Sequence, residues 1–236
     1  MVSSGTRQTD IAALLSRAEQ QLQSIMKEYD SSLHEQAIAV SLRVDIKNYF
    51  ENLRSVLDYL AHGIRAKHCA NANPRDRFYF PILPDAKQFA SQTAKWFPGL
   101  QTSSAIAWAE LEKCQPYQPG YAWLGTFNKV SNENKHESLV AQTRQEVASR
   151  VRADITGGSS VSWDPSGVRF GSGGVWIGAV PVDPSTQMPV KDPRVKVTKT
   201  VWVDFQFDGI GVSAISLMKD ALNGVKEIKN ALTSHL

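Results

Sequence analysis

One group of polar residues combines side chains that bind anions with side chains that transfer protons. Arg54, Asp58 and His62 follow one another at intervals of four residues, which on an α-helix puts neighbours roughly 40° apart around the axis and so on one face. A guanidinium binds a carboxylate or a phosphate through two hydrogen bonds, and an imidazole exchanges protons near neutral pH. Lys135 and His136 follow another apolar helical stretch that has to pack nearby. We predict that these five side chains share a small polar pocket.

The same residues also have a structural interpretation, and the sequence leaves both open. Arg54 and Asp58 can form an ion pair that orients the loop around Asn134 and Lys135. In a functional pocket His136 has to be open to solvent, because a proton donor must reach its substrate. In a structural cluster the same ring is covered and hydrogen-bonded. In either case we expect Lys135 to lie within about 10 Å of Asp58, the range over which exposed charges interact at moderate salt.

Other motifs give no support for a cofactor or a metal. No two of the five histidines are four residues apart, and the HExxH motif is absent. Asp58 and His62 can bind a metal together, but such a pair is more often a hydrogen-bonded or solvated couple. The glycines at 171–178 match neither nucleotide-binding glycine motif. Cys114 has no base beside it, as is typical of a small buried residue. We therefore expect no cofactor and no metal.

The composition is that of a globular protein of a reducing compartment. The 236 residues, 42% hydrophobic and 21% charged, fit one large domain or a domain with a substantial insert. A net charge of +3 does not by itself demand a nucleic-acid partner. Two cysteines make a disulfide framework unexpected. There is neither an apolar leader nor an apolar run of 18 residues, so we expect a cytoplasmic protein without a membrane partner.

A long amphipathic helix at residues 36–68 is predicted to be the spine of the fold. Its apolar residues recur at intervals of three and four: Leu42, Ile46, Tyr49, Leu53, Val56, Leu57, Leu60 and Ile64. A helix from residue 9 or 10 to about 29 precedes it across a polar break at 30–32, so the two form an antiparallel hairpin. Shorter helices are predicted near 86–92, capped by Asp85, from a cap at Ser103 or Ser104 to about residue 113, and over 121–130. Residues 78–84, rich in aromatic residues and proline, are predicted to be extended.

The periodicity changes from helical to alternating near residue 142. Strands are predicted within 147–207, including a hairpin in which 161–163 pair with 168–170 across a turn at 164–167. A last helix runs to about Leu232, and its apolar face has to return to the first helices. The predicted fold is α+β. Residues 1–141 form an antiparallel helical bundle, 142–210 a β-rich insert, and 211–236 a C-terminal helix that completes the bundle.

Four short motifs follow one another as LRSVLDY at 53–59, FPI at 80–82, QPY at 115–117 and NKH at 134–136. In this order they resemble a group of uncharacterised bacterial proteins, over about residues 10–139. The helical part also resembles the HEPN superfamily, helical-bundle proteins associated with RNA cleavage, toxin–antitoxin pairs and phage defence. This resemblance implies a binding module or a divergent metal-independent ribonuclease in a bacterial or phage nucleic-acid context. Its implied partner is a nucleic acid or a nucleotide.

The sequence departs from that superfamily at one point. HEPN ribonucleases are marked by an arginine and, after four to six residues, a histidine. The interval from Arg54 to His62 is longer, and that from Arg65 to His68 is shorter. We therefore carry over no catalytic residue and lean against an enzyme. The alternative is a non-catalytic structural or protein-interaction protein, in which the polar cluster only fixes the fold. A homodimer is compatible with either function.

Overall fold

The computed structural model describes residues 4–35, 40–136, 142–164, 167–168, 170–171 and 174–236. The fold is α+β, as the change of periodicity predicts. The chain divides into two compact units, residues 1–143 with 206–236, and residues 144–205. The boundaries predicted from the sequence lie at 141/142 and 210/211. Each unit is described by itself.

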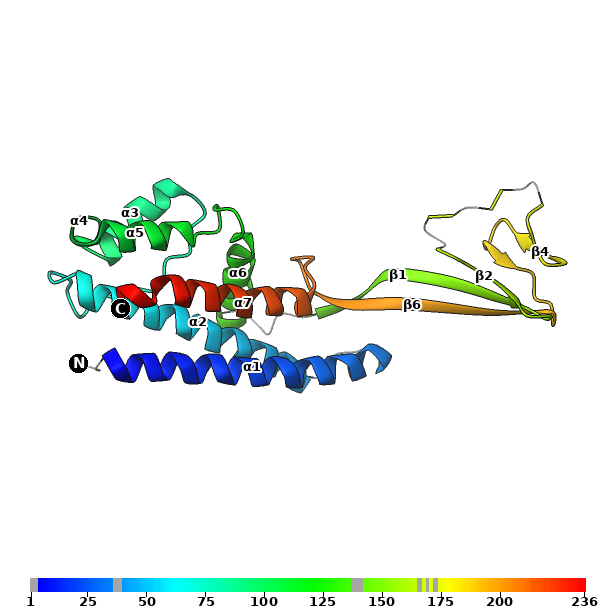
Figure 1. The fold of residues 1–236 in the computed structure, drawn as a ribbon, viewed down its shortest axis with the longest axis horizontal. Helices are drawn as coiled ribbons and strands as arrows, with labels where there is room; N and C mark the ends of the chain where they lie inside the picture. Colours follow the sequence, from blue (N-terminus) through cyan, green and yellow to red (C-terminus); the bar gives the residue numbers. More distant parts are fainter. Residues whose placement is uncertain (1–3, 36–39, 137–141, 165–166, 169, 172–173) are drawn as a thin grey trace. The chain divides into compact units, whose positions relative to one another are not determined.

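The helical unit is built around two long neighbouring helices, α1 (Ser4–Glu35) and α2 (Val40–His68) (Figure 1). Asn52 Nδ2 donates a hydrogen bond to Gln21 Oε1 at 2.8 Å, and Ser41 Oγ donates to Glu28 Oε1 at 3.4 Å. As residue numbers rise on one helix they fall on the other, so the two helices are antiparallel. The whole apolar stripe predicted for α2 is buried, from Leu42 to Ile64.

The helix α7 (Ala214–Leu232) packs against α2, α1 and α6 (Ala122–His136), so the last helix returns to the bundle as predicted. Tyr49 Oη donates to the Met218 carbonyl at 2.6 Å, and the buried apolar side chains of α7 line the contact. At the contact with α6, the ring of Trp123 lies directly against Gly224 and leaves no room for a Cβ atom there. The bundle core therefore draws on both ends of the chain.

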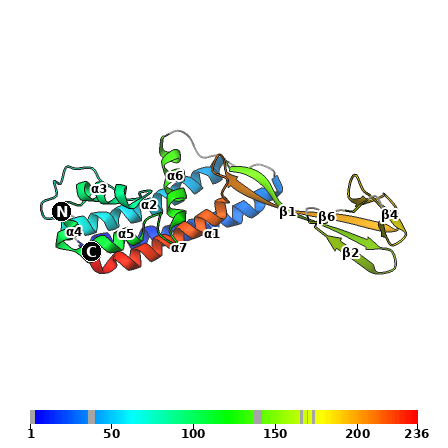
Figure 2. The same cartoon turned by 90° about the horizontal axis from the view of Figure 1, so that it is seen from above.

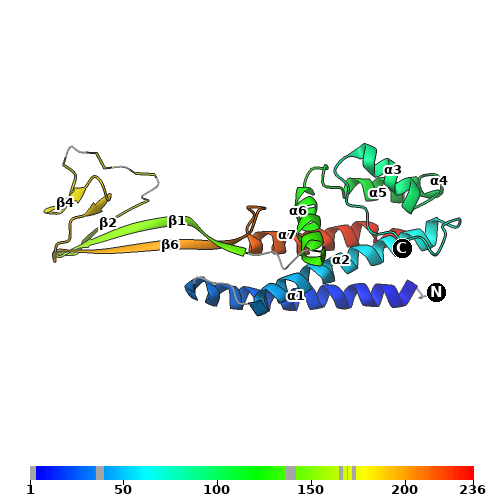
Figure 3. The same cartoon turned by 180° about the vertical axis from the view of Figure 1, so that it is seen from behind.

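Three shorter helices form a layer beside α7, α3 (Ala86–Trp96), α4 (Leu100–Ser103) and α5 (Ala105–Lys113) (Figures 1 and 3). The predicted caps are confirmed, because Asp85 Oδ1 accepts from Gln88 N at 2.8 Å and Ser104 Oγ accepts from Ala107 N at 3.3 Å. The rings of Phe89 and Trp108 meet edge to face, which packs α3 on α5.

Three helices are longer than predicted. α3 runs to Trp96, past its expected end near residue 92, and the corrections to α1 and α6 have one cause. α1 runs from Ser4 to Glu35 through the expected break at 30–32, and α6 continues through 131–136 to His136. Neither stretch contains glycine or proline. Serine, asparagine and aspartate each cost only about 0.5 kcal/mol in a helix interior, which neighbouring turns offset. Residues 36–39, where the spine helix is predicted to begin, and residues 137–141 lie outside the described part of the chain.

The second unit contains two three-stranded sheets (Figure 2). In one, β1 (Gln142–Ile155) lies between β2 (Ser159–Trp163) and β6 (Val195–Phe207). In the other, β4 (Val180–Asp183) lies between β3 (Trp176–Ile177) and β5 (Met188–Pro189). Side chains from both sheets share one apolar core, made of Val151, Ala153, Trp163, Ile177, Val180, Val182 and Val195.

The hairpin predicted across 164–167 is wrong in its pairing. The turn itself is present, because Gly167 N donates to Asp164 O at 3.1 Å, but Val168 and Phe170 lie in no strand. β2 pairs antiparallel with β1 instead, across a turn at 156–158. The two glycines of that turn have φ of +114° and +99°, a backbone conformation that glycine adopts without strain.

Replacing Gly224 with alanine tests the return of the last helix. The new methyl group meets the rigid ring of Trp123, so we expect Gly224→Ala to lower the free energy of unfolding by about 1–3 kcal/mol, measured by urea denaturation. Gly125→Ala, in α6, is the matched control, because its Cβ meets Pro116 only at 3.5 Å. That variant should be neutral or slightly more stable. Equal stability of the two variants would contradict this packing.

Candidate functional site

The charged pair at the centre of the predicted pocket binds the backbone of one residue, Phe80. Arg54 Nε lies 3.4 Å from Asp58 Oδ1, with both side chains mostly covered, at 12% and 20% exposure. Asp58 Oδ1 accepts from Phe80 N at 2.8 Å, and Arg54 Nη2 donates to Phe80 O at 3.1 Å. Arg54 Nη1 also donates to Asn128 Oδ1 on α6 at 3.3 Å. The pair therefore holds the extended segment 78–84 on α2.

Gln115 completes the attachment of the extended segment. The amide is fully buried. Its Nε2 donates to Pro81 O at 3.0 Å and to Leu111 O at 2.9 Å, and its Oε1 accepts from Leu83 N at 3.0 Å. All the hydrogen bonds of this side chain thus go to backbone groups, and none is directed at a ligand.

Arg65 fixes the loop that precedes the extended segment. This buried guanidinium donates to Asn73 O at 2.9 Å and lies 3.4 Å from Asp76 Oδ2. Its Cζ is 4.2 Å from the centroid of the Phe78 ring, a cation–π distance. Arg65 is therefore a second structural arginine.

His62 is the member of the predicted pocket that stays exposed. Its ring centroid is 4.3 Å from that of Phe78, so one side of the imidazole is covered while the residue remains open to solvent. Burial against Phe78 lowers the pKa of His62 below its ordinary value of 6.5. The guanidiniums of Arg7 and Arg65 act in the same direction, and Asp58 opposes them. The lowered pKa favours the neutral form of the ring.

Beyond His62, an open cleft lies between the beginning of α1 and the end of α2, lined by Arg7, Asp10, Tyr59 and His62. Tyr59 is 36% exposed. Arg7 has no ion-pair partner among the described residues. Neither Arg7 nor Asp10 was predicted to be a site residue. The predicted antiparallel hairpin could have indicated them, because such a hairpin places the first turns of α1 beside the last turns of α2.

The other two predicted members, Lys135 and His136, lie in the last turn of α6. Their side chains are outside the part of the chain that the structure describes, and so is the predicted distance from Lys135 to Asp58. The polar group of α6 that contacts Arg54 is Asn128, two turns earlier. Of the predicted pocket, the structure describes Arg54 and Asp58, which bind the backbone of Phe80, and His62, which lines the cleft beside Arg7. The predicted sharing with Lys135 and His136 stays a prediction.

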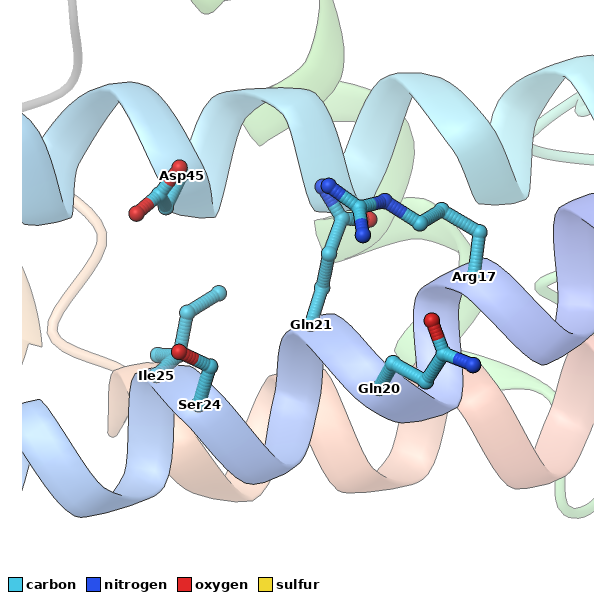
Figure 4. A pocket seen from close by; sticks show the side chains of 6 residues that line it. All are labelled: Arg17, Gln20, Gln21, Ser24, Ile25 and Asp45. Atoms are coloured by element: carbon cyan, nitrogen blue, oxygen red, sulfur yellow. The ribbon is translucent and has the colours of Figure 1, made fainter.

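A second depression between α1 and α2 is lined by polar side chains (Figure 4). Asp45 comes from α2, and Arg17, Gln20, Gln21, Ser24 and Ile25 come from α1. Gln21 is already bound to Asn52. Figure 4 shows Asp45 and Arg17 at opposite ends of the depression rather than converging on a point. It brings no proton-transfer group together with an anion-binding group.

The remaining chemistry of the described residues is limited. No group of three or more His, Cys, Asp or Glu side chains is placed there to hold a metal ion. Cys69 and Cys114 are buried free thiols, and burial raises the pKa of Cys114 to about 11, so it is not a thiolate at neutral pH. None of the described helices is long and apolar enough to span a membrane.

Comparison of the chain with protein-family models, with curated proteins and with solved structures finds no match.

The structural role of Arg54 can be measured against a surface pair on the same helix. Arg54→Ala removes the donor to Phe80 and leaves the mostly covered Asp58 without its cation, so the free energy of unfolding should fall by about 2–3 kcal/mol. Lys47→Ala breaks the exposed i,i+4 pair with Glu51, 3.6 Å apart, and should cost under about 0.5 kcal/mol. If both variants unfold at the same urea concentration, Arg54 is not structural.

Proposed function

We propose that the helical unit binds a nucleotide or single-stranded nucleic acid at the cleft lined by Arg7, Asp10, Tyr59 and His62. The observation that carries the proposal is the position of His62. Of the predicted proton-transfer and anion-binding residues described in the structure, it alone keeps an exposed side chain, and that side chain shares a cleft with the guanidinium of Arg7 and the ring of Tyr59. The resemblance to HEPN proteins supports the same ligand class.

The chemistry of the cleft fits a planar anionic ligand. The phenol of Tyr59 and the imidazole of His62 are one helical turn apart on α2 and offer flat surfaces on which a base can stack. Arg7 supplies a guanidinium for a phosphate. Asp10, one turn further along α1, can accept hydrogen bonds from a base amino group or a ribose hydroxyl.

The charge balance determines which kind of binding we propose. The net charge of +3 is small, and the cleft itself holds one guanidinium and one carboxylate. Stacking should therefore contribute more to affinity than phosphate neutralisation. We expect a weak salt dependence, with a slope equivalent to about one phosphate contact.

Cleavage of a bound RNA is the further activity that the resemblance implies. A neutral imidazole can accept a proton from a ribose hydroxyl, and the lowered pKa of His62 favours that form of its ring. We propose that the cleft binds the nucleic acid, and, as a second and separate activity, that it cleaves bound RNA without a metal. Incubation of labelled RNA with the protein in the presence of a chelator, followed by gel analysis, tests the cleavage separately.

Fluorescence anisotropy with a short labelled single-stranded RNA tests the binding. Tyr59→Ala removes a stacking surface and should weaken binding by about 5- to 100-fold, the range for one base–aromatic stack. Arg7→Ala should weaken it by up to about tenfold. Arg17→Ala is the matched control, since Arg17 is exposed on the same helix away from the cleft and should leave the affinity unchanged. Equal loss with Arg7→Ala and Arg17→Ala would exclude this site.

The pH dependence of binding should follow His62. Its pKa lies below 6.5, so the ring gains a positive charge only as the pH falls through that lower value, and affinity for an anionic ligand should then rise. His62→Gln should bind with a nearly flat profile over the same range.

The effect of a falling pH on the free energy of unfolding is opposite to its effect on affinity. The unfolded chain takes up the proton at a higher pH than the folded one, so the contribution of His62 to folding is lost as the pH falls below 6.5.

A second candidate function rests on a different observation. Arg54, Asp58 and Gln115 all direct their hydrogen bonds to the extended segment, which supports a non-catalytic interaction protein whose polar cluster serves only the fold. Under this alternative neither RNA nor mononucleotides bind at any pH. Arg54→Ala would still be destabilising, so the binding assay, and not the stability assay, separates the two functions.

A further inference from the structure

The two sheets of the second unit have four edge strands, and three carry a feature that prevents a further strand from pairing. Natural sheets protect their edges by short length, by charged side chains or by proline. β3 and β5 have two residues each, and β5 contains Pro189. β6 carries the exposed Lys196, two residues after the ion-paired Arg194. Each of these strands has a barrier to pairing.

β2 has none of these protections. It is five residues long, SSVSW, with no charge and no proline. Its first four residues are exposed, and in the sheet order β2-β1-β6 its only neighbour is β1. Among the described residues its outer edge is therefore open, with the outward backbone groups of an antiparallel strand available for pairing.

The apolar core beneath β2 is also incomplete at this edge. Val161 lies opposite Ala153 and is two residues from Trp163, both of which are buried in the core, so its side chain projects from the core face of the sheet. Nevertheless Val161 is 45% exposed. A further strand beside β2 would cover it.

We propose that β2 pairs with β2 of a second copy of this chain, in antiparallel orientation about a two-fold axis at Val161. The sequence of the strand is self-complementary around that residue. Val161 would lie opposite its own copy, and Ser160 would lie opposite Ser162 of the other chain, which allows hydroxyl hydrogen bonds and introduces no like charges. A pairing through β6 would instead bring lysine side chains of the two copies near one another.

The expected dimer is weak. A contact of five residues from each chain buries less than about 1,000 Å², the range of transient associations. This interface is independent of the cleft proposed for nucleotides, so either can fail without the other. It continues the sheet from three strands to six and leaves both copies folded as they are.

Sedimentation velocity of the full chain, from about 5 to 500 µM, tests the association. Wild type should shift from monomer toward dimer as the concentration rises. Val161→Lys places two ammonium groups opposite each other at the axis and should keep the protein monomeric. Val197→Lys is the matched control, a valine 40% exposed on the opposite edge strand, and should dimerise like wild type. A wild type that is monomeric throughout, or a dimer unaffected by Val161→Lys, overturns the proposal.

A cross-linking experiment supplies a positive signal that does not depend on a disruptive variant. Cys69 and Cys114 are buried, so a thiol introduced by Val161→Cys is the accessible one. Directly opposite residues of paired strands have Cα atoms about 4.5–5.5 Å apart, so mild oxidation should give a covalent dimer rapidly. Val197→Cys should cross-link only slowly. Equal rates would show that collision and not strand pairing produces the dimer.

Discussion

An extended segment with no neighbouring strand has to satisfy its backbone groups elsewhere, and much of the helical unit is arranged to meet this constraint. Residues 78–84 cross the bundle in that condition. Two prolines, Pro81 and Pro84, remove two N–H donors. Asp58 and Arg54 bind the N–H and the carbonyl of Phe80, and Gln115 binds the next groups. A buried backbone group without a partner costs about 1–3 kcal/mol, so these side chains hold the segment as a sheet neighbour would.

This constraint gives three of the four sequence motifs a common physical meaning. LRSVLDY supplies Arg54 and Asp58, FPI supplies the backbone that they bind, and QPY supplies Gln115. Residues separated by up to about 60 positions thus bind the same extended segment. An arginine and a carboxylate at helical spacing have the composition of a binding site, but here their hydrogen-bonding groups are occupied by the protein itself. The exposed chemistry lies one turn further along α2, at His62.

The sequence predicted secondary-structure elements better than it predicted the hydrogen-bond partners of side chains. The stripe of α2, the caps Asp85 and Ser104 and the return of α7 follow from side-chain periodicity and local hydrogen bonding, which are properties of neighbouring residues. The ends of α1 and α6 could not be predicted in this way, because polar residues such as serine and asparagine disfavour a helix by too little to end it. The ion pair of Arg54 with Asp58 was predictable from their spacing, but its hydrogen bond to the Phe80 carbonyl was not, since a backbone carbonyl has no sequence signature. The spacing of four residues alone could not show that Asp58 binds the backbone while His62 stays exposed.

The position of α7 in the chain also determines the order in which the protein can fold during synthesis. The groove that α7 fills among α1, α2 and α6 is complete only after residues 214–232 have left the ribosome. By then residues 144–205 have already emerged, so the β unit can fold first. Pairing of β1 with β6 closes the long loop between residues 143 and 206 in advance, which reduces the entropy that α7 would otherwise lose in finding its groove. Early folding of the inserted unit can therefore make it easier for α7 to complete the bundle.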